Sequence, residues 1–163
     1  MLADKLIIRE ATRTDVPAIV RMLADDHLGQ RRESVAEPLS ESYYEAFAAI
    51  ERDPNNTILV ACHGEDVVGT LQLTFIPSLS YQGGWRATVE SVRTHAPLRG
   101  HGIGRMMMER AIELARAKGC VLMQLSTHQS RKDAHRFYER LGFKGEHLGM
   151  KLMLPGSEAT VPY

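Results

Sequence analysis

Residues 99–104 read Arg-Gly-His-Gly-Ile-Gly, the most informative motif of the chain. Its three glycines occupy alternate positions, and a pattern typical of an amphipathic helix follows at once, over Gly104–Lys118. Glycine leaves the neighbouring backbone N–H groups exposed, because it has no Cβ and adopts positive φ at little cost. A helix that begins there adds free N–H groups and the positive end of its dipole. The motif therefore predicts a site for an anion, most often a phosphate, at Arg99–Arg105.

The spacing of the glycines excludes two familiar phosphate-binding loops. A Walker loop requires Gly-Lys-Ser/Thr, which the chain lacks. A dinucleotide-binding loop has Gly-x-Gly-x-x-Gly and an acidic residue about 20 residues later. Here the spacing is Gly100-x-Gly102-x-Gly104, and Val121–Ser126 carries no acid. A glycine-rich turn that binds nothing stays open as an alternative, but the flanking Arg99 and Arg105 favour a ligand.

Length and composition indicate one ordinary domain. The 163 residues suffice for a normal core, and 44% hydrophobic and 25% charged residues are typical of such proteins. Lysine plus arginine equals aspartate plus glutamate at 20 each, so the net charge is zero. This balance argues against broad binding to nucleic acid or to an anionic membrane, although it leaves room for a local basic patch.

The sequence carries no targeting or metal-binding signal. The start of the chain, MLADKLIIRE, is too polar for a signal peptide, and no run approaches the roughly 20 apolar residues of a membrane span. We therefore expect a cytoplasmic protein. Cys62 and Cys120 lie in apolar runs and are interpreted as reduced core residues. The histidines lack the spacing of zinc ligands, so no metal is expected.

Hydrophobic periodicity predicts the order β-α-α-β-β-β-α-β-α-β, an α/β fold with a mixed sheet. A helix begins at Thr14-Asp15, with Thr14 as its cap. The expected strands are Leu6–Arg9, Thr57–Cys62, Val67–Ile76, Arg86–Thr94, Val121–Ser126 and His147–Leu154, and the other helices are Ser42–Glu51, Gly104–Lys118 and Arg131–Leu141. We expect one domain over 1–163, with its core at about 6–154 and a loose tail from Pro155.

Two blocks of sequence resemble the GNAT family of N-acetyltransferases. The block Val92–Gly104 is similar to the acetyl-CoA motif Arg/Gln-x-x-Gly-x-Gly/Ala, and Ala134–Phe143 is similar to the segment Ala-x-x-Phe-Tyr-x-x-x-Gly-Phe. The blocks occur in the family's order and at a fitting spacing, and the element order matches over roughly 6–154. The resemblance implies the GNAT fold, in which the sheet splays open beside the coenzyme, and acetyl-CoA as co-substrate.

The resemblance also implies which residues bind acetyl-CoA. The amides of Gly100–Arg105, which include those of His101, Gly102, Ile103 and Gly104, match the loop that binds the pyrophosphate, and Arg99 shapes or supplements it. Val92 and Thr94 match the strand positions whose backbone groups pair with the pantetheine arm. Arg131 stands where many members have Asn, so it either meets a phosphate or lies on the surface.

Two residues match catalytic positions of the family. Tyr138 matches the general acid that protonates the departing thiolate, and the alternative is a core aromatic beside Phe137. Glu90 lies where many members place a base for the amine, directly or through water, and the alternative is a solvated charge or salt bridge. The alternation of Val89-Glu90-Ser91-Val92 predicts that Glu90 and Val92 share one face.

The resulting expectation is acetyl transfer to the primary amine of a small molecule, by direct attack in a ternary complex. Neither cysteine is placed like a nucleophile, which argues against an acetyl-enzyme. A non-catalytic acetyl-CoA sensor stays open, as does acetylation of a protein lysine or N-terminus. The family often forms dimers, so a homodimer is a further expectation. The loop 29–41 occupies a region that shapes acceptor specificity in the family, although a solvated loop with Arg31-Arg32 would look the same.

Overall fold

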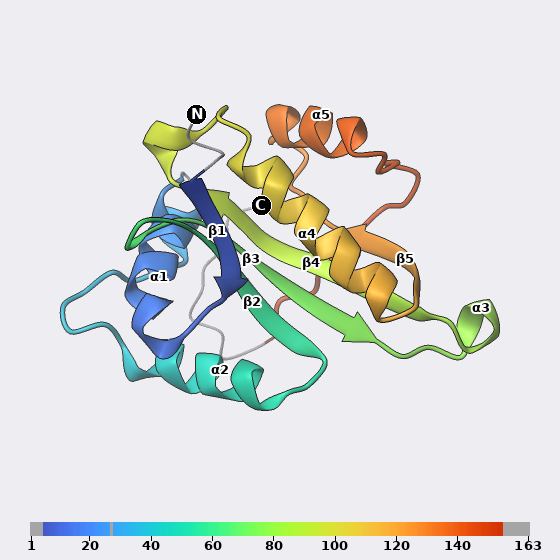
Figure 1. Ribbon diagram of the computed structural model, residues 1–163, viewed down its shortest axis with the longest axis horizontal. Helices are drawn as coiled ribbons and strands as arrows, with labels where there is room; N and C mark the ends of the chain where they lie inside the picture. The colour runs from blue at the N-terminus through green and yellow to red at the C-terminus, as the bar shows by residue number, and fades with distance from the viewer. Residues whose placement is uncertain (1–4, 27, 155–163) are drawn as a thin grey trace.

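The computed structural model describes residues 5–26 and 28–154. Its centre is a five-stranded sheet in the order β1-β2-β3-β4-β5 (Figure 1). Neighbouring strands are antiparallel except for β4 and β5, which are parallel and joined through α4. The strands are β1 (Leu6–Glu10), β2 (Asn56–His63), β3 (Asp66–Ile76), β4 (Trp85–Thr94) and β5 (Cys120–Leu125). The predicted α/β class with a mixed sheet is confirmed.

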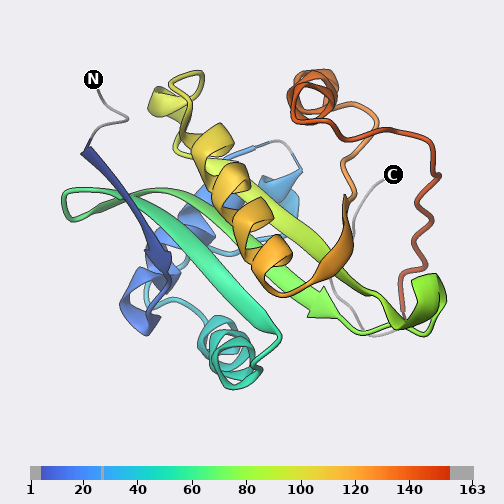
Figure 2. The same ribbon diagram turned by 45° about the vertical axis from the view of Figure 1, so that its right-hand side comes forward.

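Helices cover both faces of the sheet (Figures 1 and 2). On one face α4 packs against β3, β4 and β5, and on the other α1 and α2 pack against β2, β3 and β4. The α-helices are α1 (Val16–Ala24), α2 (Glu41–Arg52), α3 (Ser80–Gly83), α4 (Ile103–Ala117) and α5 (Lys132–Arg140). Short 3₁₀ segments are η2 (Arg13–Asp15), η3 (Gly29–Arg31) and η4 (Ala96–Leu98).

The helix α4 forms the main core with the sheet. Its buried residues recur at helical spacing and face buried residues of β2, β3 and β4; on α4 they are Ile103, Met107, Met108, Ala111 and Ala115. The helix approaches β3 so closely that a Cβ on Gly69 would lie 2.7 Å from the Met107 Sδ. This packing fixes the first turn of α4, and hence the glycine motif, against the sheet.

The entry to α1 differs from the prediction. The sequence predicts Thr14 as the cap, but α1 is preceded by η2, and its N-cap residue is Asp15. The Asp15 carboxylate is buried, accepts two hydrogen bonds from the Arg9 guanidinium at 2.7 and 2.9 Å, and accepts one from the Thr12 N–H at 2.7 Å. The carboxylate of Asp15, rather than the hydroxyl of Thr14, accepts the hydrogen bonds of this turn, because it can accept both from a backbone N–H and from the Arg9 side chain of β1.

A β-bulge interrupts the second half of β4. Gln72 of β3 pairs with Glu90, whereas Thr70, two residues along, pairs with Arg93, three residues along β4. Ser91 absorbs the extra residue with φ +55°. The expected alternation is therefore wrong here: Glu90 is exposed, while Val92 packs on the core with Val89. The bulge instead places Glu90 and Arg93 on one face of the sheet.

The parallel pairing of β4 with β5 ends halfway along β4. It runs from Trp85↔Cys120 to Val89↔Leu125, and no later described residue of β4 pairs with β5. Figure 2 shows the chain beyond β5 turning away from β4 toward α5. The backbone of residues 90–94 therefore has a free edge on this side, which is the opening that the resemblance implied.

The strand expected at His147–Leu154 does not form. These residues have no regular structure, and Leu148, Met150 and Leu152 are 76, 89 and 85% exposed. Their alternation is that of a half-buried strand, but a strand also requires a partner that completes its hydrogen bonds, and local sequence does not supply one. The sheet of the described residues thus has five strands. The expected tail, 155–163, lies outside the described residues.

Candidate active site

The glycine motif forms an open backbone surface at the start of α4. Gly100 and Gly102 have φ values of +82° and +85°, and Gly102 is the N-cap residue of α4. A Cβ at either position would meet no atom within 4 Å, so the backbone conformation rather than crowding demands glycine. The Met106 N–H donates to the Gly102 carbonyl at 3.1 Å and closes the first turn of the helix. Earlier amides of the turn are thus available to an anion.

The side chains beside this surface engage other partners. The Arg99 guanidinium donates to the Thr94 carbonyl at 3.3 Å and pairs with Asp25 at 3.2 Å. The His101 Nδ1 lies 3.1 Å from the Arg99 carbonyl, and the Arg105 Nε lies 2.8 Å from Glu109 Oε1 along the exposed face of α4. The backbone, with the helix dipole behind it, is therefore the part of the motif that these side-chain contacts leave open to an anion.

The free edge of β4 lies next to this surface. Val92 and Thr94 belong to the half of β4 that does not pair with β5, and His95 and η4 lie between Thr94 and the glycine motif. Gly104 comes close to both sides of the opening, because a Cβ there would lie 3.5 Å from Phe137 and 3.7 Å from Thr94. The structure thus brings together the predicted coenzyme-binding residues of β4, the loop and α4.

Tyr138 lies on α5, packed between aromatic rings. Its ring centroid is 5.1 Å from that of Phe137 and 5.9 Å from that of Phe143, both in edge-on geometry. Burial raises the pKa of Tyr138 above its ordinary value of about 10, while the charges of Arg93 and Arg131 oppose that rise. The phenol therefore keeps its proton at neutral pH, as a general acid requires.

Glu90 lies on a polar part of the sheet face opposite α4. Alternation along β4 places Arg86, Thr88 and Glu90 on this face, and the Thr88 Oγ1 accepts a hydrogen bond from Gln124 of β5 at 3.2 Å. The Glu90 side chain is exposed and hence accessible to a water molecule or an amine. Tyr138, by contrast, packs together with Val92 against the main core that α4 forms with the sheet.

An ionic cluster that the sequence interpretation missed lies at the end of β4 that does not pair with β5. Asp26, which follows α1, pairs with Arg131 at the N-cap of α5 and lies 3.8 Å from the Arg93 guanidinium of β4. We call Asp26, Arg93 and Arg131 the Asp26 cluster. The sequence predicts that Arg131 meets the coenzyme or solvent, but its guanidinium is engaged by Asp26.

One local signal could have pointed to this cluster. Arg93 stands between Val92 and Thr94 in a strand otherwise expected to be half buried, and a buried arginine requires a partner. Its partner Asp26 could not be named, because no spacing rule connects the end of α1 with β4. Burial opposes ionisation of Asp26, but the Gly29 N–H and the two arginines outweigh it, and the pKa of Asp26 falls below its ordinary value.

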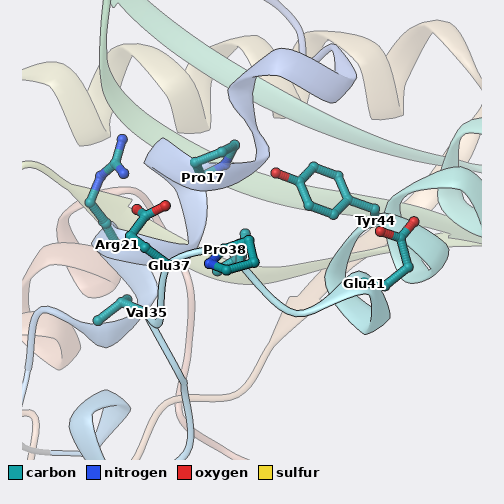
Figure 3. A pocket seen from close by; sticks show the side chains of 8 residues that line it. Pro17, Arg21, Val35, Glu37, Pro38, Glu41 and Tyr44 are labelled. Atoms are coloured by element: carbon teal, nitrogen blue, oxygen red, sulfur yellow. The ribbon is translucent and has the colours of Figure 1, made fainter.

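A cavity of about 260 Å³ lies elsewhere, between α1 and the chain that enters α2 (Figure 3). Pro17 and Arg21 line it from α1, and Glu41 and Tyr44 line it from α2. None of the predicted site residues contributes to its lining. Across the described part of the chain, no three His, Cys, Asp or Glu side chains gather as a metal-binding group. None of the described helices has the length and apolar content needed to cross a bilayer.

Known proteins are similar to this chain in both sequence and fold. The chain is 36% identical over 107 residues to the aminoalkylphosphonate N-acetyltransferase of Salmonella typhimurium, covering 66% of this chain and 69% of the relative. It is 29% identical over 121 residues to the glucosamine 6-phosphate N-acetyltransferase of Trypanosoma brucei brucei, covering 73% of this chain and 80% of the relative.

A solved structure is still more similar. The crystal structure of a transcriptional regulator from Bacillus halodurans C-125 superposes with a TM-score of 0.90 at 54% identity, covering 91% of this chain and 99% of that one. The sequence model of the Acetyltransferase (GNAT) family matches residues 17–143, which include the glycine motif and all of α5 with Tyr138. The match spans most of the chain, and the fold agrees with it: this protein belongs to the GNAT family of acetyltransferases.

Proposed function

We propose that this protein transfers the acetyl group of acetyl-CoA to the primary amine of a small molecule, by direct attack in a ternary complex. The observation that carries the proposal is that β4 pairs with β5 along only its first half. Its free edge at residues 90–94 adjoins the glycine surface and the core side that holds Tyr138. The two N-acetyltransferase relatives, named for an aminoalkylphosphonate and a glucosamine phosphate, support a small acceptor.

The chain's residues divide the binding of acetyl-CoA among them. The amides of Gly100–Arg105 and the dipole of α4 bind the pyrophosphate, because they are convergent donors with no side chain above them. The edge of β4 at Val92 and Thr94 offers its N–H groups to the amide-bearing pantetheine arm, because the carbonyls of these two residues accept hydrogen bonds from the Arg93 and Arg99 side chains. A backbone N–H at the bulge near Val92 stabilises the oxyanion of the tetrahedral intermediate.

Proton transfer falls to Glu90 and Tyr138. An alkyl ammonium has a pKa of about 10, so Glu90, directly or through water, removes one proton before the nitrogen attacks the thioester carbon. The carbon–sulfur bond then breaks, and Tyr138 donates its proton to the departing thiolate. The second proton lost from nitrogen as the amide forms returns through solvent to the phenolate. The products are the N-acetyl amine, free coenzyme A and one proton.

A non-catalytic acetyl-CoA-binding regulator is the second candidate. It is favoured by one observation, that the Bacillus halodurans protein 54% identical to this chain is described as a transcriptional regulator. Such a protein would keep the glycine surface but would not need Tyr138 or Glu90 at the opening. Acetylation of a protein lysine or N-terminus is a third candidate, and it requires the same residues.

One experiment separates these candidates. Acetyl-CoA binding is measured by calorimetry, and free thiol release is then followed over a panel of aminoalkylphosphonates, amino sugars, polyamines, amino acids and lysine peptides. We expect acetyl-CoA to bind and to raise the melting temperature, and at least one small amine to release thiol. Binding without thiol release from any amine would support the regulator. Release with peptides alone would support a protein acceptor, and absence of binding would refute all three.

A further inference from the structure

The Asp26 cluster is built from three separate parts of the chain and is largely shielded from solvent. The Asp26 Oδ1 accepts the Gly29 N–H at 2.6 Å and the Leu28 N–H at 3.1 Å, which fixes the carboxylate. Its Oδ2 faces Arg131 and Arg93. The side chains of Asp26, Arg93 and Arg131 are only 13, 16 and 25% exposed. The two guanidinium groups are therefore held in place by one anchored acid.

The cluster has more positive than negative charge. One carboxylate faces two guanidinium groups, and the charge of the exposed Arg32 also reaches Arg93. The Arg93 Nη1 donates to the Val92 carbonyl at 2.8 Å, whereas its Nε is buried and has no hydrogen-bond partner among the residues that the structure describes. Burial and the neighbouring charges of Arg131 and Arg32 lower the pKa of Arg93. A surplus of buried positive charge with an unused donor favours binding of an anion.

The surplus charge lies two ladder positions from Glu90 and acts on Tyr138. The bulge places Arg93 on the same sheet face as Glu90, two ladder positions away and thus about 7 Å along the strand. Arg131 caps the helix that carries Tyr138, and both arginines act electrostatically on that phenol. An acceptor whose amine approaches Glu90 would therefore place a nearby group against the two arginines.

The coenzyme phosphates have a different site. The glycine surface is formed at the start of α4, and α4 packs on the sheet face that carries Val89. Arg93 lies on the opposite face with Glu90. The basic residues nearest to the glycine motif, Arg99 and Arg105, pair with Asp25 and Glu109 and do not join the Asp26 cluster. The surplus charge is thus on the acceptor side of β4.

We propose that the acceptor amine carries an oxyanion within a few bonds of its nitrogen, and that Arg93 and Arg131 bind this oxyanion while Asp26 positions them. Phosphonate, phosphate and carboxylate groups all accept paired hydrogen bonds from a guanidinium fork. Arg32 adds long-range attraction at the rim of the site. This proposal rests on the proposed function, because it identifies the class of acceptor for the same reaction.

The first arm of the test measures binding without turnover. Methylphosphonate and acetate are titrated by calorimetry into the wild-type protein saturated with acetyl-CoA, which occupies the glycine surface. We expect saturable binding of at least one anion, weakened about tenfold or more by Arg93→Gln or Arg131→Gln. The matched control is Arg136→Gln, because Arg136 is an exposed α5 arginine paired with Asp133. Each variant is first checked for unchanged acetyl-CoA affinity and circular dichroism.

The second arm compares acceptors that differ in charge. The value of kcat/KM is measured for 2-aminoethylphosphonate and β-alanine against ethanolamine and propylamine. We expect the wild type to favour an anionic amine about tenfold or more, and Arg93→Lys, which keeps the charge but loses the fork, to reduce this preference through KM. Arg32→Gln, an exposed change that should not affect folding, is expected to reduce it less and in a salt-dependent manner.

The two arms separate failure of this proposal from failure of the proposed function. Equal turnover of charged and neutral amines by the wild type would overturn the oxyanion site and leave acetyl transfer standing. Weakened acetyl-CoA affinity in Arg93→Gln, with anion binding intact, would overturn it by assigning Arg93 to the coenzyme. Absence of thiol release from every amine would refute the proposed function, and the calorimetric arm would still decide whether the arginines bind an oxyanion.

Discussion

The Asp26 carboxylate accepts a hydrogen bond from the Arg131 guanidinium across 105 positions of sequence. This ion pair joins the segment that follows α1 in the sequence to Arg131, the N-cap residue of α5. Asp26 is itself fixed by the N–H groups of Leu28 and Gly29, so the local turn determines where the arginine lies. The segment that follows α1 and the helix that carries Tyr138 are therefore connected by this side-chain contact.

The variant Gly29→Ala tests whether this turn positions the cluster. A Cβ at Gly29 would lie 1.9 Å from the Leu23 carbonyl oxygen, so the turn must move and carry Asp26 with it. We expect unfolding free energy to fall by about 1–3 kcal/mol and KM for the acceptor to rise. Urea denaturation and steady-state kinetics measure the two effects. Gly145→Ala, where a Cβ meets nothing within 4 Å, is the matched control. An unchanged KM would show that the turn does not position the acceptor site.

Replacing Tyr138 by Phe tests the general acid. The ring and its contacts with Phe137 and Phe143 stay, but the proton donor is lost. We expect kcat to fall about 100-fold or more, with acetyl-CoA affinity unchanged, as measured by thiol release and calorimetry. Tyr81→Phe, at a tyrosine that is 67% exposed on α3, controls for loss of a hydroxyl. If Tyr138→Phe retains wild-type kcat, the acid is another group.

Glu90→Gln tests the base while keeping the size and polarity of the side chain. Because the amine must lose a proton before it attacks, we expect kcat/KM for the amine to fall about 100-fold at neutral pH. The loss should shrink as pH approaches the acceptor's own pKa, where free amine becomes abundant. Glu113→Gln on the exposed face of α4 is the control. A uniform loss at every pH would instead indicate that Glu90 binds the substrate.

A pair of glycine variants separates coenzyme binding from backbone strain. Gly102 and Gly119, at the two ends of α4, have φ values of +85° and +81°, and a Cβ on either meets nothing within 4 Å. Alanine at each position should therefore cost about 1–2 kcal/mol of unfolding free energy. We expect only Gly102→Ala to weaken acetyl-CoA binding, because only Gly102 belongs to the anion surface. Calorimetry that shows equal affinity for both variants would refute the assignment of this surface.

Asp15→Asn tests the buried ion pair with Arg9 and predicts a pH dependence. The hydrogen bonds from Arg9 lower the pKa of Asp15 below its ordinary value of 3.8. The stabilisation is therefore present above pH 3.8 and is lost as pH falls through the lower folded-state pKa. We expect Asp15→Asn to lose about 1–3 kcal/mol at pH 7, and the difference from wild type to shrink below pH 3.8. Denaturation curves at several pH values measure this.

A control carboxylate sharpens this measurement. Asp133 is on the surface of α5, with a side chain that is 97% exposed, so Asp133→Asn should change stability little at any pH. A difference between Asp15→Asn and wild type that stays constant from neutral pH to about pH 3 would show that loss of the ion pair is not its cause.

Local features of the chain were predictable from sequence. The helix α4 and the hairpin between β2 and β3 match their predicted ranges within a residue, because periodicity and turn residues act over short distances. The glycine motif at Gly100–Gly104 was also predictable, because left-handed φ values at Gly100 and Gly102 are a local demand. The same holds for the position of Tyr138 on a helix, since its block of sequence resembles a family segment.

Features that depend on partners distant in sequence were not predictable. Ser91 adopts a positive φ that its own sequence does not signal, and the bulge there turned the expected face of Val92 the other way. The segment 147–154 has the alternation of a strand but does not join the sheet of the described residues. Asp26, Arg93 and Arg131 meet only because the fold brings three separate segments together. Pairing between segments is fixed by the whole core rather than by any one of them.

The carboxylate of Asp26, which two arginines share, also constrains any redesign of the protein's specificity for its acceptor. Asp26 follows α1, where an exchange of the loop between relatives would replace it. A graft of that loop alone, however, would leave Arg93 on β4 and Arg131 before α5 as two half-buried cations with no acid between them. A functional chimaera therefore has to transplant the acid and both bases together. New substrates in this fold would then arise through coordinated changes in three segments rather than by loop swapping.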